Sequence, residues 1–537
     1  MEIGTKNITS WGAIVQQFKL FIDGKDVDTG KYEYFPYADQ VILDFKKTYQ
    51  VITKLKKGEF VEDVDKYIYA RYCIGDNELN KKAIESAYEA SKIFRKFSIS
   101  KRRKILYDIH KYLVLNKDNI IKLLSIEGHP YQLAKWEYSA MDNAFCKTTL
   151  DLFKDSVWDE VGSVGKEKLY LVRKPDGVVA LVPPKNASAS NSLSAAYCFL
   201  AGNAVIVKAP LKAPLATIFV WKNIVAKALK ENNAPEGIMS IIVGNSKIIM
   251  DEWMINPKIN DIFFFGESEN GLEIGKRAYI NGKKAILELS GKDNLFVWEG
   301  CDLEGATNSA VDAFLGSTQI CMLPKTLVVH EKIYDKFKEK MLQKIANLKF
   351  GLPSTETTFF TPVVKMKECQ EFLAEALCKG GKLLCGGKKV DYNGNENDRG
   401  IYFQPTLVEI DTENSELDNI RLIKEENFFP VIPIIKVKSS KDSKKDRDND
   451  IFNKMLEFSQ KNEYGLRASV WVKSAYYTRQ FMKHIDKCAL LRINSQHIAF
   501  SLYLPGQGGV GKTGGPFGEA SYLLQKTTHL QGVSLTR

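Results

Sequence analysis

Residues 261–291 read DIFFFGESENGLEIGKRAYINGKKAILELSG, and this stretch decides the fold class. Two short apolar runs, at 261–265 and 285–289, enclose a segment over 271–280 with the spacing of an amphipathic helix. Short apolar runs are typical of strands that are buried on both faces, and parallel neighbours need a crossover that is usually helical. The stretch therefore predicts a strand, a helix and a second, parallel strand.

The same alternation extends back toward residue 177. Apolar runs at 178–182, 204–207 and 239–243 alternate with amphipathic segments such as 215–229. Buried strands joined by helices form an α/β fold with a Rossmann-like, doubly wound parallel sheet. Ligands of such sheets bind beyond the carboxyl ends of the strands, so we expect the functional residues there.

A second α/β region follows, and its expected strands lie at 295–298, 326–330, 431–437, 469–472 and 490–494. Up to about residue 150 the chain is expected to be mainly helical, with helices over 83–97 and 102–124, after a short strand-and-turn entry over 5–34. With 537 residues, the chain exceeds the about 250–300 at which a single core stops growing. We expect a dinucleotide-binding domain over 1–150 and 174–290, a catalytic domain over 291–505, and a small β oligomerisation arm with a C-terminal tail over 151–173 and 506–537.

Charge and hydropathy narrow the function classes. The 76 lysines and arginines exceed the 65 aspartates and glutamates by 11, and no basic stripe interleaved with aromatics indicates a nucleic-acid groove. The densest charge run, residues 438–449, carries both signs and is expected to be an exposed loop. No apolar run reaches the ~18 residues that span a bilayer, and the N-terminus lacks the pattern of a signal peptide. We expect a cytoplasmic protein without nucleic-acid or membrane partners.

The cysteines and histidines form no metal-ligand pattern. There are nine cysteines, with irregular spacing and no C-x-x-C, and six histidines. An odd, irregular set argues against a disulfide framework and against a zinc site. Most of the cysteines are expected to be small core residues in a reducing compartment, and no metal is expected.

Glu288 and Cys321 are the first candidates for chemistry. Glu288 stands at the end of a predicted strand, and Gly291 behind it frees the backbone to turn sharply. Cys321 follows GSTQI and precedes another predicted strand. A thiolate is a strong nucleophile and a carboxylate can act as a general base, so the pair suits covalent catalysis. Taken alone, a cysteine in this setting is most often a core residue.

The combined pattern resembles the aldehyde dehydrogenase superfamily. LELSGK at 287–292, then QIC at 319–321, match the E-L-G-G-K and G-Q-x-C segments that this superfamily carries in this order. Further matching segments are FFG at 264–266, GIYFQPT at 400–406, EENFFPV at 425–431 and EYGL at 463–466. Each match is weak alone, but together, in order over most of the chain, they identify the chain as a member of this superfamily.

The resemblance implies a mechanism. Cys321 would add to an aldehyde as a thiolate, and hydride would leave to NAD or NADP, so that a thioester remains. The Cys321 backbone N–H and an asparagine amide would hold the oxyanion. Asn186 matches that asparagine if one residue is deleted, the alternative being a polar turn residue. Glu288 matches the base that activates water, which argues against the alternative of a coenzyme-A-acylating dehydrogenase or acyl reductase.

The resemblance also implies a cofactor site. Its expected residues are Lys208, Gly266, Glu267, Gly271, Leu289, Glu426 and Phe428. No G-x-G-x-x-G follows the first strand, so the pyrophosphate is expected at the helix that starts after Gly266. Glu267 replaces the family's usual serine, so either its side chain points away or the cofactor sits differently. Leu211 replaces a glutamate common in NAD-preferring members, so NADP can be accepted.

Two further features depart from the family pattern. Ser194 and Ala195 occupy the region of a buried family lysine, so proton removal from Glu288 is expected to follow another route. Residues 506–513, GQGGVGKT, satisfy the P-loop motif, which would imply a nucleotide hydrolase. A P-loop opens a helix, however, and the Gly-Gly-Pro run at 514–516 would spoil it. We favour the glycine-rich loop of the family.

Two alternating segments predict assembly. Residues 157–173 turn at Gly165, and residues 528–535 end the chain in a similar alternation. The family closes its oligomers with such an arm and strand. Both would be exposed edge strands in a monomer, which is an aggregation hazard. We expect a homodimer or homotetramer in which Leu169, Leu171 and Leu530 become buried.

Overall fold

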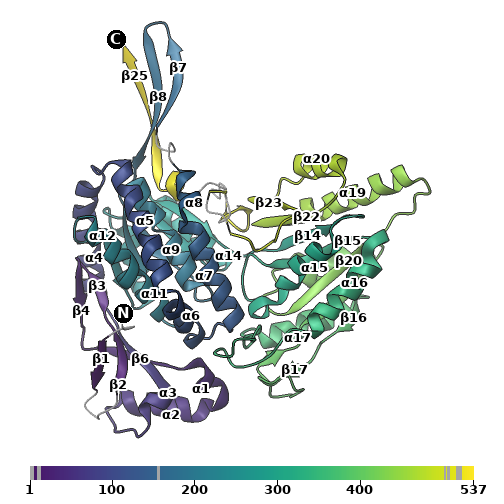
Figure 1. Cartoon of the computed structure of the whole chain (residues 1–537), viewed down its shortest axis with the longest axis horizontal. Coiled ribbons are helices and arrows are strands. Elements are labelled where there is room, and N and C mark those ends of the chain that lie inside the picture. Colours follow the sequence, from purple (N-terminus) through teal and green to yellow (C-terminus); the bar gives the residue numbers. More distant parts are fainter. Residues whose placement is uncertain are drawn as a thin grey trace.

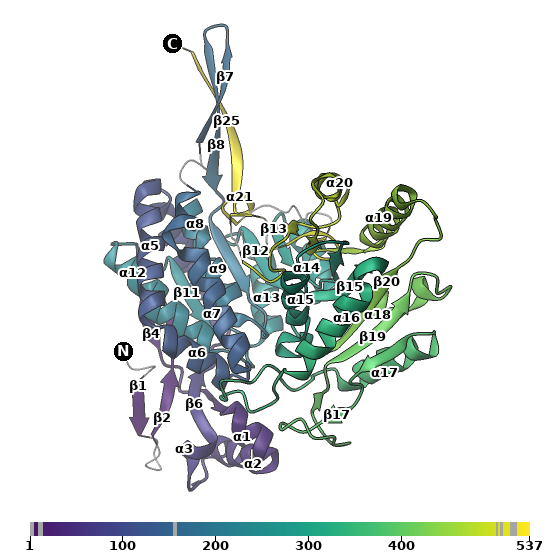
Figure 2. The same ribbon diagram turned by 45° about the vertical axis from the view of Figure 1, so that its right-hand side comes forward.

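The computed structural model describes residues 5–8, 14–153, 158–500, 503–504, 508–515 and 523–536. Two α/β bodies lie side by side, and a slender β arm projects from the first of them (Figure 1). A turned view shows the same arm standing clear of both bodies (Figure 2). The predicted fold class, a Rossmann-like sheet with a second α/β unit and a small β arm, is confirmed.

The first body is built on a seven-stranded sheet of order β13-β12-β9-β10-β11-β3-β4. Its parallel strands are β9 (Val178–Val182), β10 (Ala204–Lys208), β11 (Met239–Ile242), β12 (Asp261–Phe265) and β13 (Lys284–Glu288). The apolar runs predict these strands, and β10, β11 and β12 are buried along their whole length. The hairpin of β3 (Leu20–Ile22) and β4 (Lys25–Val27) extends the sheet.

Helices pack on this sheet and share one hydrophobic core with it. They are α4 (Asn77–Phe94), α5 (Ile99–Leu115), α6 (Lys117–Ile126), α7 (Tyr131–Phe145), α8 (Lys147–Asp151), α9 (Ser188–Ser194), α10 (Tyr197–Ala201), α11 (Leu215–Phe219), η1 (Val220–Val225), α12 (Ala226–Glu231), α13 (Ser246–Ile255) and α14 (Ser268–Ile280). The helix predicted over 102–124 is in fact two helices. Asn116 breaks it, because its side chain is buried and donates to the Tyr112 carbonyl at 2.7 Å.

The N-terminal region is less helical than predicted. A sheet of order β1-β2-β6-β5 lies there, with three short helices beside it. These elements are β1 (Thr5–Ile8), β2 (Ile14–Phe18), β5 (Tyr32–Pro36), α1 (Ala38–Leu43), α2 (Phe45–Lys56), α3 (Val64–Tyr67) and β6 (Ile68–Cys73). The strand β6 is buried along most of its length, but the tyrosines and the arginine of its sequence, IYARYC, hide the apolar run that would reveal a strand.

The second body carries a seven-stranded sheet of order β16-β19-β20-β15-β14-β22-β23. The predicted strands are β14 (Asp293–Val297), β15 (Pro324–His330), β20 (Val431–Val437), β22 (Arg467–Trp471) and β23 (Leu490–Ile493). The prediction missed β16 (Lys382–Cys385) and β19 (Thr406–Asp411). The short β16 lies in the glycine-rich stretch that follows residue 380, where turn residues hide a strand.

The remaining elements of this body are η2 (Asp312–Thr318), α15 (Leu303–Val311), α16 (Glu331–Ala346), α17 (Met366–Cys378), β17 (Lys389–Val390), β18 (Tyr402–Phe403), η3 (Leu417–Asn419), α18 (Arg421–Lys424), α19 (Lys444–Lys461), β21 (Tyr464–Gly465), α20 (Ala475–His484) and β24 (Val510–Gly511). The charge run over 438–449, which was predicted to be an exposed loop, is partly helical. Ser443 caps α19 by accepting from the Asp446 N–H at 3.1 Å, and Asp448 in the second turn of α19 is buried.

The arm is a three-stranded antiparallel sheet of order β25-β8-β7. Its strands are β7 (Trp158–Val164), β8 (Glu167–Pro175) and β25 (Thr528–Thr536), and α21 (Leu523–Lys526) leads into β25. The sequence suggests that both segments stand as edges in a monomer, and this is wrong for β8. The strand β25 of the same chain pairs with it along its full length. The edges left open are β7 and β25.

No helix in the described part of the chain is long and apolar enough to cross a membrane.

Candidate active site

Cys321 follows a strained turn that ends η2. Gly316, Ser317 and Thr318 have positive φ angles of 56°, 54° and 63°. Such conformations cost non-glycine residues on the order of 1–3 kcal/mol each. Ser317 Oγ donates to the Thr361 carbonyl at 2.6 Å and accepts from the Thr361 N–H at 3.0 Å. These bonds hold the turn and fix the backbone that carries Cys321.

The Cys321 side chain packs against an apolar cluster. The members of this cluster are Leu133, Trp136, Leu315, Ile320, Met322, Leu323, Phe359, Leu466, Ile498 and Phe500. Burial raises the pKa of the Cys321 thiol to about 12, helped by the carboxylates of Glu426, Asp293 and Glu288 and opposed by Lys325. The resting thiol is therefore protonated at neutral pH, and a base must take its proton before the sulfur can attack.

Asn186 lies beside the Cys321 turn. It stands in the loop between β9 and α9, and its side-chain amide donates to the Gln319 carbonyl at 2.9 Å. Gln319 is two residues before Cys321, and its own side chain is tied to the backbone of Pro362 and Val364. One amide hydrogen of Asn186 thus fixes its position, and the other remains for a ligand.

A buried ion pair supports Asn186, and the sequence did not reveal it. His129 Nε2 lies 2.9 Å from the Asn186 carbonyl and 3.2 Å from Glu137 Oε2. Glu137 Oε1 accepts from the Ser190 N–H at 2.9 Å. Burial opposes the charged form of His129, but Glu137 and the Asn186 carbonyl outweigh it and raise the pKa of the imidazole. The pair therefore joins the end of the loop that carries Asn186 to the first turn of α9.

Glu288 ends β13, and its side chain is only 7 % exposed. The Gly508 N–H donates to Oε2, and the Lys526 ammonium lies 3.5 Å from Oε1. Burial raises the pKa of the carboxyl, against the opposing effects of Lys526, Gly508 and Arg467. Glu288 also contributes to the raised pKa of Cys321, so the two groups lie within electrostatic reach of one another.

Lys208 is a buried cation at the carboxyl end of β10. Burial lowers the pKa of its ammonium to about 8, and no carboxylate within the described ranges pairs with it. Lys185, next to Asn186, is close enough to Lys212 that this neighbour, together with burial, lowers its pKa. Leu211, beside Lys212, is 37 % exposed. A polyhydroxyl or phosphate group would fit such a set of cations, so these residues suit a nucleotide.

Glu267 precedes the first turn of α14, where the pyrophosphate of a dinucleotide is expected. Its side chain makes no capping bond to the helix, and its Oε1 lies 3.0 Å from the Lys365 ammonium. Of the two alternatives for Glu267, the geometry favours a carboxylate directed away from the helix N-terminus. The N–H groups there remain available to an anion.

Gly271 and Leu289 have a packing role in the structure. A Cβ at Gly271 would lie 2.1 Å from Leu289 Cδ2, so only glycine lets α14 approach the end of β13 this closely. Gly266 donates its N–H to the Glu288 carbonyl at 3.1 Å. These three residues therefore shape the corner between β12, α14 and β13.

Glu426 and Phe428 are linked to the region of Cys321 through Gly291 and Lys325. Glu426 Oε1 accepts from the Gly291 N–H at 3.1 Å, and the Lys325 ammonium stands 5.3 Å from the Phe428 ring centroid. Lys325 also donates to the Thr318 carbonyl at 2.7 Å, in the strained turn. The structure thus gathers the predicted catalytic residues and the residues predicted for the nicotinamide end around one turn.

The P-loop-like motif does not form a phosphate loop in its described part. Val510 and Gly511 form β24, paired with β21, and no helix follows within 508–515. The Lys512 ammonium pairs with Glu463 at 2.5 Å, and Thr513 Oγ1 donates to the Ser290 carbonyl at 2.7 Å. The P-loop interpretation is therefore rejected.

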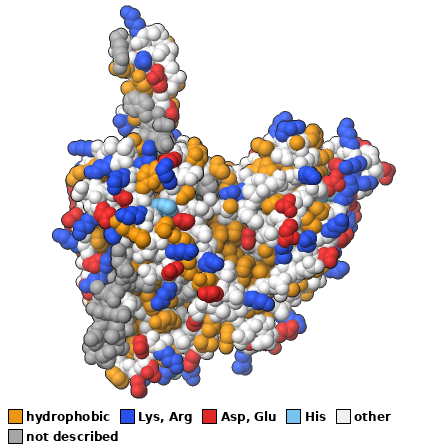
Figure 3. Space-filling view, in the orientation of Figure 1, with side chains coloured by type: hydrophobic (Ala, Val, Ile, Leu, Met, Phe, Trp, Pro, Cys, Tyr) orange, Lys and Arg blue, Asp and Glu red, His pale blue; other side chains and the backbone are white. Residues whose placement is uncertain are grey.

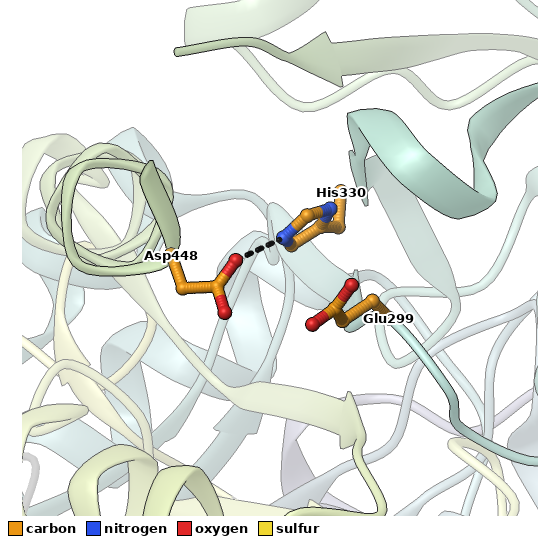
Figure 4. A group of neighbouring side chains, drawn as sticks. All are labelled: Glu299, His330 and Asp448. Carbon is orange, nitrogen blue, oxygen red and sulfur yellow. Dashed lines mark ion pairs between the residues drawn. The ribbon is translucent and has the colours of Figure 1, made fainter. Parts of the chain in front are cut away.

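Glu299, His330 and Asp448 could together ligate a cation, since their donor atoms lie within 4.8 Å of one another (Figure 4). Ammonium groups already neutralise them. The Lys332 ammonium lies 3.1 Å from Glu299 and 3.6 Å from Asp448, and Lys444 lies 3.5 Å from Glu299. Burial lowers the pKa of His330 to about 4. We interpret the group as an ion-pair network that joins β15 to α19.

A model of the aldehyde dehydrogenase family matches residues 53–533, and the chain belongs to this family. It is an NAD(P)-dependent aldehyde dehydrogenase family enzyme. The chain is 28% identical over 463 residues to lactaldehyde dehydrogenase of Methanocaldococcus jannaschii, covering 85% of this chain and 92% of that protein. It is 25% identical over 533 residues to 3,6-anhydro-alpha-L-galactose dehydrogenase of Vibrio sp., covering 96% and 99%.

Solved structures agree with this assignment. Glyceraldehyde-3-phosphate dehydrogenase GapN of Methanocaldococcus jannaschii, complexed with NADP, matches with a TM-score of 0.72 and 27% identity, covering 86% of this chain and 95% of that one. Aldehyde dehydrogenase 21 of Physcomitrella patens matches with a TM-score of 0.79 at 20% identity, covering 97% and 98%, which shows the shared fold.

Proposed function

We propose that the chain oxidises an aldehyde to a carboxylic acid through a thioester on Cys321. The observation that carries this proposal is that the Asn186 amide binds the braced turn before Cys321 while the buried Glu288 carboxylate lies within electrostatic reach of the thiol. In the first step the Cys321 sulfur bonds to the carbonyl carbon, and its proton passes to a base. The Asn186 amide and the Cys321 N–H stabilise the oxyanion.

The second half of the proposed reaction is hydrolysis. Bound NAD(P)⁺ supplies the hydride acceptor, for which Lys208, Glu426 and the N–H groups at the start of α14 provide the binding groups. Water then adds to the thioester carbon, its proton passes to Glu288, and the bond to sulfur breaks. The base within electrostatic reach of Cys321 favours hydrolysis over transfer to coenzyme A. Stimulation of turnover by free coenzyme A would favour the alternative.

We propose a short, uncharged aldehyde as substrate. Cys321 packs against a cluster of apolar side chains, and hydrophobic side chains gather where the two bodies meet (Figure 3). A charged substrate would lose hydration against these apolar side chains. Cofactor reduction should be measured with NAD⁺ and with NADP⁺ for three aldehydes: lactaldehyde, glyceraldehyde 3-phosphate and succinate semialdehyde. These aldehydes appear in the names of similar proteins. We expect the highest kcat/KM with lactaldehyde, and no turnover of any aldehyde would refute the function.

We propose that the cations beside Leu211 allow NADP⁺ to bind. Leu211→Glu should then shift the kcat/KM ratio toward NAD⁺ by about tenfold, because a carboxylate would face the 2′-phosphate. The matched control is Leu211→Gln, which has the same shape without the charge and should move the ratio little. Equal ratios in all three enzymes would mean that Leu211 does not face the adenosine ribose.

We propose that the open edges of the arm close a homo-oligomer. Leu530→Asp should raise the dissociation constant of the assembly at least about tenfold, since Leu530 is an exposed leucine on an edge strand. Gln531→Asp is the control, because it points to the other face of β25. Light scattering at micromolar concentration measures both variants. A parent enzyme that is monomeric and active would exclude the assembly.

A further inference from the structure

Lys526, which nothing in the sequence pattern singles out, lies against the Glu288 carboxylate. Its ammonium is 3.5 Å from Glu288 Oε1, and the two side chains are only 10 % and 7 % exposed. A Cβ placed on Gly508 would lie 2.6 Å from the Lys526 nitrogen and 3.3 Å from Glu288 Oε1. Lysine, carboxylate and the glycine backbone therefore form one closely packed group.

The backbone around Lys526 is anchored to the first sheet, so the ammonium is held in place rather than carried on a free tail. The Lys526 carbonyl accepts from the Lys284 ammonium at 2.8 Å. The Thr527 carbonyl accepts from the Asn203 amide at 2.8 Å. Leu524 of α21 is fully buried in the core of the first body.

The Lys526 ammonium affects the ionisation of the Glu288 carboxyl. A carboxylate as buried as Glu288 loses hydration, and burial accordingly raises its pKa. The groups that oppose this effect are Lys526 on α21, the Gly508 N–H and Arg467 on β22, with Lys526 the largest of them. The Cys321 thiol is a further titratable group within electrostatic reach of the carboxylate. Without Lys526, a larger fraction of Glu288 would be protonated at a given pH, and the protonated carboxylic acid cannot act as a base.

We propose that Lys526 is the positioning residue of the Glu288 base: it holds the carboxylate ionised and fixes its orientation for attack of water on the thioester. The inference rests on the proposed function. It also supplies the cation that this chain lacks at Ser194 and Ala195, both of which are buried and uncharged. Because α21 leads directly into β25, the same segment joins the base to the arm.

The proposal separates the two halves of the reaction. Addition of sulfur and departure of hydride need no cation beside Glu288, so thioester formation should continue without Lys526. Hydrolysis requires that a water proton pass to an ionised Glu288 while the oxygen bonds to the acyl carbon and sulfur leaves as thiolate. That step should slow, and it should regain speed at higher pH, where Glu288 ionises without help.

The test is stopped-flow cofactor reduction with Lys526→Met and Lys526→Gln, followed across pH. We expect a burst of about one equivalent per active site in both variants, and a steady-state rate at neutral pH lower by about tenfold or more. The acid limb of the steady-state profile should move to higher pH. Lys526→Arg keeps the charge and should restore most of the rate and the original limb.

The matched control is Lys512→Met, which removes an exposed lysine of the same tail that pairs with Glu463 at the surface. It should behave like the parent enzyme. A Lys526 variant with the parental steady-state rate and an unmoved pH limb would overturn the proposal. The proposal would also be overturned if folded Lys526→Met and Lys526→Gln lost the burst and the steady-state rate to the same extent, because that result indicates a structural role. A parent enzyme that shows no burst with any aldehyde would instead overturn the proposed function.

Discussion

Cys321→Ser is expected to lower kcat/KM for aldehyde oxidation by about 10⁴-fold or more, as loss of an enzyme's nucleophile commonly does. A serine hydroxyl ionises far less readily than a thiol, even than a thiol whose pKa burial raises to about 12. The substitution is close to isosteric, so the turn held by Ser317 and Thr361 should persist. Steady-state cofactor reduction measures the loss.

Cys378→Ser provides the matched control, because Cys378 is an exposed cysteine at the end of α17. It should leave kcat/KM unchanged. Thermal unfolding of both variants should show midpoints close to that of the parent. Turnover by Cys321→Ser within tenfold of the parent would exclude Cys321 as the nucleophile, and with it the thioester route.

The parallel sheets could be read from the sequence because their strands are local signals. Runs such as 204–207 and 261–265 are apolar on both faces, and this property does not depend on distant parts of the chain. Strand β6 has the same burial, but its tyrosines and its arginine conceal it. The break at Asn116 was missed because the apolar periodicity continues across it, and only the side-chain bond to Tyr112 marks the end of a helix.

The predictable part of the site comprises residues inside recognisable segments. Cys321 and Glu288 stand in such segments, and the structure places the Asn186 amide against the turn before Cys321. His129 and Lys526 could not be found in this way. Each acts through one contact with a residue far away in sequence, His129 with Asn186 and Lys526 with Glu288. Only the folded chain supplies such contacts.

The pairing of β25 with β8 is likewise a contact between distant parts of the chain that only the folded structure reveals. The alternation over 528–535 predicts a strand, but its partner lies over 350 positions earlier, and in the register observed His529 faces Lys174. The segment just before β25 is bound to β13, where the Lys526 carbonyl accepts from Lys284 and the Lys526 ammonium meets Glu288. A deletion of everything after Gln525 would therefore remove both the arm strand and the partner of the base, which is why point substitutions in β25 test assembly more cleanly.

Glu288→Gln should leave a burst of about one equivalent of reduced cofactor per active site and lower the steady-state rate by about 10²-fold or more. Glutamine keeps the shape and can still accept from the Gly508 N–H, but it cannot take a proton from water. In the parent, hydrolysis needs the carboxylate, and burial raises the pKa of Glu288. The steady-state rate should therefore fall as pH drops through this raised pKa, and the limb should be absent in Glu288→Gln.

Rapid mixing at several pH values distinguishes the two steps in one experiment. The burst reports thioester formation, and the slope after it reports hydrolysis. Glu288→Asp is the informative control: it keeps the charge but withdraws the carboxylate by one methylene, so it should retain the acid limb at a reduced rate. If Glu288→Gln abolishes the burst while the protein stays folded, Glu288 also takes the proton of Cys321. An unchanged steady-state rate would instead assign water activation to another group and remove the basis for the role of Lys526.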